Sequence, residues 1–231
     1  MIGTPRVHHR VADSTNQRAK ELAAAGAPHG TLVTAGEQTT GRGRQGRAWV
    51  APPGSAVLMS LLVRNLDDRF PLLPLVAAVA VAEACESLAP VRCEIKWPND
   101  VWIERRKVAG ILVEGRPAED WAVLGIGLNV GTREFAEELG SIATSLRIAG
   151  GVEVGVESAL GVVLEALAGW LGKGGGAVLA GWTERDALRG EHVRWAEGSG
   201  VAAGIDDAGS LLVETDAGLV TLGAGEVHLE R

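Results

Sequence analysis

The sequence predicts an α/β protein, of the α+β kind, in which a mixed sheet is flanked by helices and followed by a small β unit. Helical and strand patterns alternate up to about residue 130, which is the order expected for a sheet covered by helices. The chain has 231 residues and a hydrophobic fraction of 46%, enough for a substantial core. From about residue 190 the pattern changes to short strands separated by turns.

Two helices are predicted in the first half of the chain. In residues 13–27, Ser14 is a candidate N-cap, Gln17 completes a capping box with it, and Gly26 is a C-terminal stop. The apolar segment at about 72–88 is the second helix. Its uncharged run is too short for a bilayer, which needs about 20 residues, so we expect a buried helix and no membrane partner.

The second half of the chain divides into an ambiguous segment, two helices and the β unit. Residues 133–151 are polar and ambiguous, whereas 156–172 and 177–189 show amphipathic helical patterns joined by the flexible segment KGGG. We place a domain boundary near residue 190, which gives domains at 1–189 and 190–231. Single strands are expected at 31–38, 55–63 and 121–130. Residues 93–115 are expected to form a strand followed by a hairpin that turns at 104–107. Turns of the β unit are expected at 206–209 and 215–218.

Charge and cysteine content exclude several classes of protein. The 22 Lys and Arg residues face 29 Asp and Glu residues, and the net charge of -7 argues against a broad footprint on duplex nucleic acid. The N-terminal segment lacks the apolar run of a secretory signal. Cys85 and Cys93 have no framework of other cysteines, so we expect two reduced core residues in a cytoplasmic protein.

The stretch GRGRQGRAWV at residues 41–50 combines glycine with positive charge. Glycine lets backbone N–H groups approach a ligand, and arginine donates paired hydrogen bonds to phosphate or carboxylate oxygens. If the segment is extended, Arg42 and Arg44 point to one side and Arg47 to the other. The stretch therefore suits a bound anion, and a solvated basic loop is the alternative. The usual nucleotide signatures, GxxxxGK[ST] and GxGxxG, are absent from the sequence.

A second group of residues lies in KWPNDVWIERRKVAGILVE. Pro98 fixes a turn, and Asn99 and Asp100 can hydrogen-bond to local backbone or help to hold a cation. Lys107 opens a strand close to Gly110, so its side chain can face a pocket. The alternative is that Lys107 is one more solvated charge of the hairpin.

The motifs DSTN, GRGRQGRAW, KWPNDVW, KVAGILVE and GIGLNV, in this order and spacing, resemble the catalytic core of the biotin protein ligase family. The resemblance covers residues 10–130, and the tail is similar to the family's C-terminal domain. It implies the class II synthetase-like fold of biotin and lipoate ligases, with a small C-terminal SH3-like β-barrel. Because about a dozen residues precede DSTN, it also implies the monofunctional type, without the N-terminal DNA-binding domain, and hence no DNA partner.

The activity that the resemblance implies has two steps. Biotin and ATP, with Mg²⁺, form biotinyl-5'-AMP and pyrophosphate, and the biotinyl group then passes to a lysine of a biotin carboxyl carrier protein of a biotin-dependent carboxylase such as acetyl-CoA carboxylase. The alternatives are a lipoate or octanoate ligase or transferase of the same fold and, more remotely, a non-catalytic RNA-binding module. Exposed sheet edges offer a route to a homodimer.

The resemblance also implies the roles of individual residues. The catalytic residues are Lys107, Arg42 and Asp100, of which Asp100 is also assigned to the Mg²⁺ shell. The residues implied to bind biotin are Ser14, Thr15, Asn16, Gln38, Gly41, Arg42, Gly43, Arg44, Lys107 and Gly110. The residues implied to bind ATP and the adenylate are Arg42, Arg44, Arg47, Trp49, Lys107 and Asn129.

Two further expectations concern the walls of this site. Trp49 and Trp97 either wall the pocket or belong to the core. The residues available to pack on adenine are Phe135, Leu139 and Ile142. Because ordering about ten loop residues costs roughly 10 to 15 kcal/mol of backbone entropy, we expect residues 41–50 to close only over bound substrates.

Overall fold

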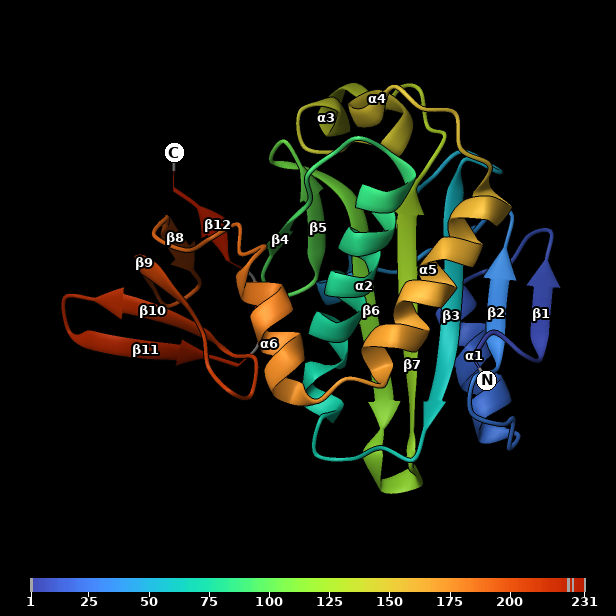
Figure 1. The fold of residues 1–231 in the computed structure, drawn as a ribbon, viewed down its shortest axis with the longest axis horizontal. Coiled ribbons are helices and arrows are strands. Elements are labelled where there is room, and N and C mark those ends of the chain that lie inside the picture. The colour runs from blue at the N-terminus through green and yellow to red at the C-terminus, as the bar shows by residue number, and fades with distance from the viewer. Residues whose placement is uncertain (1, 224, 226, 231) are drawn as a thin grey trace.

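The computed structural model describes residues 2–223, 225 and 227–230 and contains two sheets (Figure 1). The larger sheet has the strand order β1-β2-β3-β7-β6-β5-β4. β1 and β2 are parallel and the other neighbours are antiparallel, so the predicted mixed sheet is confirmed. Its strands are β1 (Arg6–His9), β2 (Leu32–Ala35), β3 (Ala56–Arg64), β4 (Glu94–Lys96), β5 (Asp100–Ile103), β6 (Arg106–Arg116) and β7 (Trp121–Asn129).

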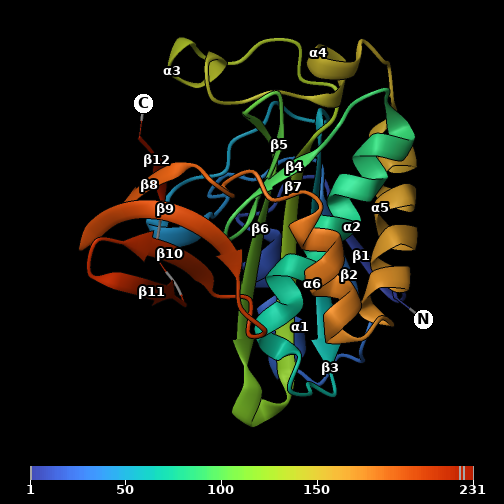
Figure 2. The ribbon, with the colours of Figure 1, turned by 60° about the vertical axis from the view of Figure 1, so that its left-hand side comes forward.

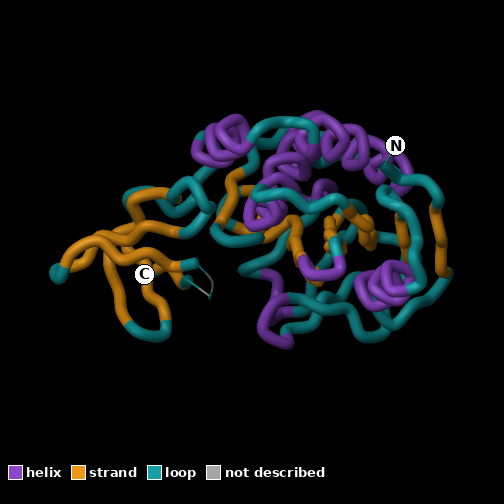
Figure 3. The backbone as a smooth tube through the Cα atoms, turned by 90° about the horizontal axis from the view of Figure 1, so that it is seen from below, coloured by secondary structure: helices purple, strands orange, loops and turns teal. Residues whose placement is uncertain are grey.

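Helices cover both faces of this sheet (Figures 2 and 3). α2 (Leu73–Leu88), α5 (Val156–Leu171) and α6 (Gly175–Thr183) lie on one face, and α1 (Thr15–Ala24) lies on the other. β3 is buried along almost its whole length because helices pack on both of its sides. This explains its continuous apolar sequence, which does not alternate as a half-exposed strand would.

α2 is the central helix of the core. With the turn that precedes it, the segment Phe70–Leu88 is long and apolar enough to cross a membrane by length and composition, but 67% of its apolar window is buried inside the protein. α2 contacts α5, α6 and the strands β4 to β7. A helix that is apolar on all sides is stable in water only when neighbours surround it, as they do here.

The smaller sheet is antiparallel, with strand order β11-β10-β9-β8-β12. Both predicted turns are present, because Asp206 accepts hydrogen bonds from Ala208 N and Ser210 N, and Thr215 Oγ1 accepts one from Ala217 N. The expected SH3-like barrel is not closed, since the described residues of β11 and β12 do not pair with each other and β12 has two residues. The strands are β8 (His192–Trp195), β9 (Gly198–Ile205), β10 (Leu211–Thr215), β11 (Gly218–Leu222) and β12 (His228–Leu229).

The smaller sheet packs against the larger domain through Trp97. This side chain is 1% exposed and its Nε1 donates to Gly209 O at 3.0 Å. Gly209 also lies against Leu72 and Leu75 at the start of α2. The turn at 206–209 therefore connects the C-terminal sheet to the core, and the boundary near residue 190 stays a prediction.

Several local predictions differ from the structure. β1 was not expected, because its four residues RVHH show no apolar alternation. The ambiguous residues 133–151 contain two short helices, α3 (Glu137–Gly140) and α4 (Leu146–Gly150). α6 begins inside the glycine segment that was expected to be a flexible linker, and it ends at Thr183, before residue 189.

The predicted capping box is wrong. Ser14 has the extended backbone of an N-cap, but its side chain makes no capping hydrogen bond. Gln17 Nε2 donates to Glu21 Oε1 instead, one turn further along α1. The helix stop is confirmed, because Gly26 follows α1 with a φ of 83°. The hydroxyl of Ser14 is consequently available for another partner.

Stability should depend on the contact of α5 with α2. Leu167 is fully buried, so Leu167→Ala should lower the free energy of unfolding by about 2 to 5 kcal/mol through lost contacts and a residual cavity. Urea unfolding followed by circular dichroism measures this loss. Leu219→Ala is the control, because Leu219 is 61% exposed and its truncation should change stability by about 0.5 kcal/mol at most. Equal effects in the two variants would contradict this account of the core.

Candidate active site

The motifs singled out in the sequence meet in one pocket on the face of the sheet that carries α1. Its empty volume is about 920 Å³, including open solvent at the mouth. The walls come from the first residues of α1, the loop 42–49, the segment 96–100 and the strands β6 and β7. Gly225 and Val227 add a wall from the C-terminal sheet.

Glycines leave the floor of this pocket bare. Gly110 on β6 and Gly127 on β7 are paired neighbours across the strands. A Cβ atom at Gly127 would lie 2.7 Å from the Nε1 of Trp49, and one at Gly110 would lie 3.1 Å from its Cζ3. The indole ring of Trp49 therefore packs against backbone where any other residue would place a side chain.

A β-bulge directs Lys107 into the pocket. Val101 pairs with Ala109 and Trp102 pairs with Lys107, so Val108 is an extra residue on β6. Because faces alternate along a strand, Lys107 would otherwise share the core-facing side of Ala109. The bulge brings Lys107 to the side of the sheet on which Gly110 lies. A Cβ atom added to Gly110 would lie 3.0 Å from Lys107 Cε.

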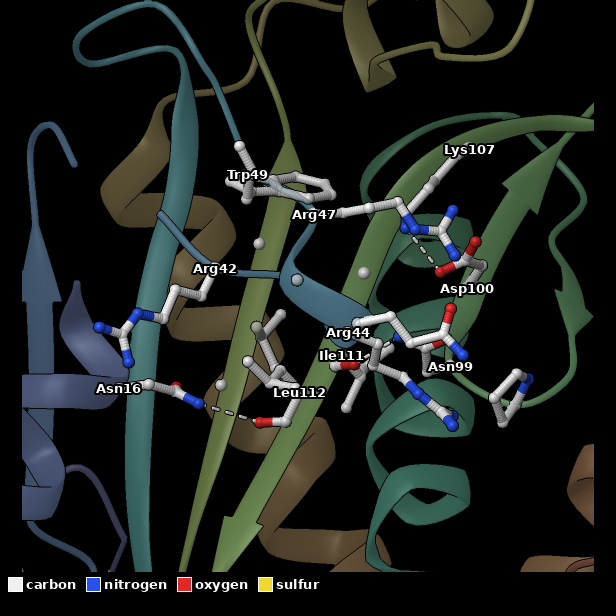
Figure 4. Close-up of a pocket in the computed structure, with 18 of the residues that line it drawn as sticks. Asn16, Arg42, Arg44, Arg47, Trp49, Asn99, Asp100, Lys107, Ile111 and Leu112 are labelled. Carbon is white, nitrogen blue, oxygen red and sulfur yellow. Dashed lines mark hydrogen bonds and ion pairs between the residues drawn. The ribbon is translucent and has the colours of Figure 1, made fainter. Parts of the chain in front are cut away.

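Lys107 forms an ion pair with Asp100 (Figure 4). The distance from Nζ to Oδ1 is 2.6 Å, although the angles at Asp100 are not those of a hydrogen bond. The ammonium group also lies 5.6 Å from the ring centre of Trp49. The backbone of Lys107 bonds to Ile142 O and Thr144 N. These contacts favour the pocket-facing interpretation of Lys107 over a solvated hairpin charge.

The glycine and arginine loop is folded rather than extended. Arg44–Gly46 form a 3-10 turn, in which Gln45 has a φ of 54°. Gly43 N donates to Arg47 O at 2.7 Å, and Trp49 N donates to Gly41 O at 3.0 Å. A side chain at Gly41 would overlap Trp49 O. The expectation for an extended segment, two arginines on one side and one on the other, therefore does not apply.

The three arginines of this loop diverge over the pocket (Figure 4). Arg42 points toward Asn16, Arg47 points toward Asp100, and Arg44 donates to Gly225 O at 3.3 Å. Among the described residues that line the pocket, the cations are Arg42, Arg44, Arg47, Lys96 and Lys107. The one carboxylate of this described lining is Asp100. This excess of positive charge suits an anionic ligand.

The opposite end of the pocket is lined by polar, uncharged side chains of α1 and by Gln38, and Arg42 points toward it. Thr15 N donates to Gln38 Oε1 at 2.7 Å, which fixes the orientation of that amide. The Nε2 of Gln38 would lie 2.9 Å from a Cβ atom at Gly41, beneath the start of the loop. Ser14 is 2% exposed, and its hydroxyl makes no hydrogen bond within the part of the chain that the structure describes. These groups can bind a ligand that has few polar atoms.

Asn16 lines the pocket but is engaged by other residues of the protein. Its Nδ2 donates to Leu112 O at 3.2 Å and to Glu114 Oε2 at 2.9 Å. Its Oδ1 lies 2.6 Å from Ser60 Oγ, and a Cβ atom at Gly125 would lie 2.8 Å from its Cγ. Sequence reasoning missed Ser60 and Glu114. Glu114 was detectable, since it follows Gly110 at an even spacing on the same strand and so shares its face.

Glu114 is an ionised group next to the pocket. Partial burial raises its pKa, but hydrogen bonds from Lys20 and Asn16 outweigh this effect, and the pKa is lowered overall. Lys20 Nζ lies 2.6 Å from Glu114 Oε1. Because the folded pKa is depressed, this contribution to stability is complete above the unfolded value of about 4.3 and is lost as the pH falls through the folded value.

Other predicted site residues lie outside the pocket or at its edge. Asn129 is not among the residues that line it; its Nδ2 donates to Thr144 O at 3.0 Å. Trp97 fulfils both expectations, because it lines the pocket and is buried. The three adenine candidates, Phe135, Leu139 and Ile142, do not line the pocket, whereas Trp49 does.

The fold and the pocket define a class of protein: an α/β domain whose pocket combines several cations with polar, uncharged side chains on a bare strip of sheet. Residues 8–130 match the biotin/lipoate A/B protein ligase family, and residues 190–229 match the biotin protein ligase C-terminal domain. The chain belongs to the biotin protein ligase family and is an enzyme.

Relatives of known name cover almost the whole chain. The bifunctional ligase/repressor BirA of Bacillus subtilis is 36% identical over 99% of this chain and 75% of its own length. The biotin–acetyl-CoA-carboxylase ligase of Paracoccus denitrificans is 35% identical over 93% of this chain and 96% of its own. The biotin protein ligase of Aquifex aeolicus, solved with biotin and ATP, has a TM-score of 0.87 at 31% identity and covers 99% of both chains.

The bare floor of the pocket can be tested at Gly127. Gly127→Ala should push the Trp49 ring off the sheet, because the new methyl group would overlap the indole. Fluorine NMR of protein labelled with 5-fluorotryptophan measures this shift, with the Trp49 signal assigned by Trp49→Phe. Gly140→Ala is the control, since nothing lies within 4 Å of that position. An unchanged Trp49 signal in Gly127→Ala would contradict the packing described.

Proposed function

We propose that this enzyme activates biotin with ATP and transfers it to a lysine of the biotin carboxyl carrier protein of acetyl-CoA carboxylase. The observation that carries the proposal is the position of Lys107, between a polar pocket for a neutral ring and a cationic end for phosphates. The named relatives and the Aquifex complex with biotin and ATP support these substrates.

In the first step an oxygen of the biotin carboxylate attacks the α-phosphorus of ATP. The new C–O–P linkage forms as the bond to the β-phosphate oxygen breaks, and pyrophosphate leaves. Two unit charges 4 Å apart repel by roughly 4 kcal/mol at an effective dielectric of 20. Lys107 bridges the carboxylate and the α-phosphate, so it stabilises charge that moves during transfer and does not act as a base.

In the second step a neutral lysine amine of the carrier attacks the acyl carbon of biotinyl-5'-AMP. An amide bond forms, AMP leaves with the electrons of the C–O bond, and the amine releases its proton to solvent. Asp100 lies beside Lys107 and is the carboxylate closest to this chemistry among the described lining residues. We assign it to orienting Lys107.

Biotin would lie with its ring at the polar end. Ser14, Thr15 and Gln38 face the ureido group there, and Lys107 faces the carboxylate. Loop residues from Arg42 to Arg44 and the bare strand at Gly110 complete the walls, and Gly41, which is not among the lining residues, lies directly before them. Because the rest of biotin is apolar, this small number of polar groups is sufficient for its recognition.

ATP would bind at the cationic end. Arg44 and Arg47 hold phosphate oxygens, and Trp49 offers an aromatic face to the nucleobase. Asn129 lies behind this end, where its buried Oδ1 lacks a partner among the described residues. Arg42 and the loop 41–50 close over the intermediate, since several contacts together are needed to hold a glycine-rich loop shut.

Mg²⁺ would enter with ATP. Asp100 is the one carboxylate in the described lining, and no group of three metal-binding side chains is found among the described residues. This fits Mg²⁺, which binds through one or two carboxylates together with phosphates and retained waters. When bound, the ion would neutralise phosphate charge, and Asp100 would be its protein ligand in addition to orienting Lys107.

The remaining features of the proposal concern location and partners. We place the protein in the cytoplasm. For the residues of this sequence we propose no membrane partner and no DNA partner, because a net charge of -7 argues against broad contacts with the phosphates of a nucleic acid. β1 is an edge strand of the large sheet, and edge pairing is our route to a homodimer. Analytical ultracentrifugation showing only monomer at micromolar concentration would contradict the homodimer.

Two substitutions separate activation from retention of the intermediate. Lys107→Ala should lower biotinyl-5'-AMP formation at least about 100-fold, because one charge-stabilising donor is lost while the fold remains. Arg42→Ala should form the adenylate but release it into solution, because the loop loses its closing contact. Chromatography of radiolabelled AMP products, free and protein-bound, measures both effects.

The matched control for these variants is Lys173→Ala, since Lys173 packs on Trp170 away from the pocket and should leave both steps unchanged. Wild-type adenylate formation in Lys107→Ala would instead support the alternative that Lys107 is a solvated charge of the hairpin. Retention of the adenylate in Arg42→Ala at the wild-type level would rule out the closing role of Arg42.

A further inference from the structure

We propose that Lys20, Glu114, Asn16 and Ser60 form a hydrogen-bonded relay behind the pocket that sets which groups of its polar end donate and which accept. The relay would thereby determine specificity for biotin over acids whose ring has no hydrogen-bonding groups. Its members are positioning residues, which act through Thr15 and Gln38. This inference rests on the proposed function, because it concerns the biotin end of the same site.

The direction of the relay begins at Glu114. Its carboxylate accepts from Lys20 at 2.6 Å and can only accept from its other neighbours. Asn16 must therefore turn its NH₂ group toward Glu114, where the distance is 2.9 Å, and its second amide proton goes to Leu112 O. The Oδ1 of Asn16 consequently faces Ser60.

Ser60 passes this direction on to Thr15. Its Oγ lies 2.6 Å from Asn16 Oδ1 and 2.8 Å from Thr15 Oγ1. A hydroxyl has one proton and an amide oxygen cannot donate, so the proton of Ser60 serves Asn16. The one proton of Thr15 is then shared between Ser60 Oγ and Gln38 Oε1, which lies 3.1 Å away and can only accept.

The pocket is left with a defined pattern of donors and acceptors. Thr15 Oγ1 keeps lone pairs that can accept, and Gln38, whose Oε1 is held by Thr15 N, keeps its two amide protons. A cyclic urea needs this pattern, because its N–H groups donate and its carbonyl accepts. The dithiolane ring of lipoate has neither, so it would leave these buried groups unpaired.

Burial keeps the members of the relay bonded to one another. Ser60 is fully buried, and Thr15 and Asn16 are each 4% exposed, so water cannot easily replace a missing partner. Asn16 also lies directly over Gly125, and its hydrogen bonds to Leu112, Glu114 and Ser60 hold it there. A change at Ser60 or Glu114 is therefore transmitted to Thr15, although neither residue contacts the substrate in the proposed site.

The test uses Ser60→Ala and Glu114→Gln in steady-state pyrophosphate release from ATP. In both variants the KM for biotin should rise about tenfold or more, while kcat stays within about threefold and the KM for ATP is unchanged. The ratio of kcat/KM for biotin to that for lipoate should fall by the same factor. Ser60→Cys, which retains a weak donor, should lie between Ser60→Ala and the wild type.

The matched control is Glu119→Gln, which removes a charge in the turn after β6, where Glu119 accepts hydrogen bonds from Arg116 and Trp121 and has no contact with the relay. It should behave as the wild type. An unchanged KM for biotin in both Ser60→Ala and Glu114→Gln, with thermal unfolding at the wild-type temperature, would overturn the relay. A fall in kcat together with a rise in the KM for ATP would also overturn the relay, because such changes indicate general damage to the active site.

A second readout does not depend on activity. The side-chain amide signals of Asn16 in nitrogen-edited NMR should shift in Ser60→Ala and Glu114→Gln and stay fixed in Glu119→Gln; fixed signals in all three would overturn the relay. If the wild type releases no pyrophosphate with biotin, the proposed function fails, and the NMR outcome still decides whether the relay exists.

Discussion

The site depends on a strip of bare backbone along β6 and β7. Gly110, Gly125 and Gly127 present no side chains on the face that carries α1, so functional side chains lie directly against the strands. Trp49 packs over Gly110 and Gly127, and Asn16 over Gly125. A methyl group at any of these positions would take the space of a functional side chain. The glycines are thus required by close packing rather than by backbone strain, since none has a positive φ.

This strip also separates the two chemical tasks of the pocket. At one end α1 and β6 hold an uncharged, prearranged set of donors and acceptors behind which Glu114 is paired with Lys20. At the other end the loop residues 44–47, β4 and β6 supply cations, and Asp100 is the one carboxylate of the described lining. Lys107 lies between them because a bulge turns it to this face. A substrate that is neutral at one end and anionic at the other is complementary to this arrangement.

The sequence predicted the main elements and the motifs that converge, because these depend on local periodicity and on residue type. It did not predict how they converge. Strand alternation alone places Lys107 on the side of Ala109, and only the bulge at Val108 corrects this. Ser60 is one more small residue in an apolar strand by sequence, and its role appears only when α1 packs on β3. The unclosed C-terminal sheet was likewise missed, since pairing between distant strands is not a local property.

The most direct test of the account is pyrophosphate release from ATP and Mg²⁺ by the wild-type enzyme, measured in parallel with biotin, lipoate, octanoate and no acid. The account predicts release with biotin alone, because only biotin carries both a carboxylate and a ring that satisfies the polar end of the pocket. Release with lipoate or octanoate at a comparable rate, or release with none of the acids, would contradict it.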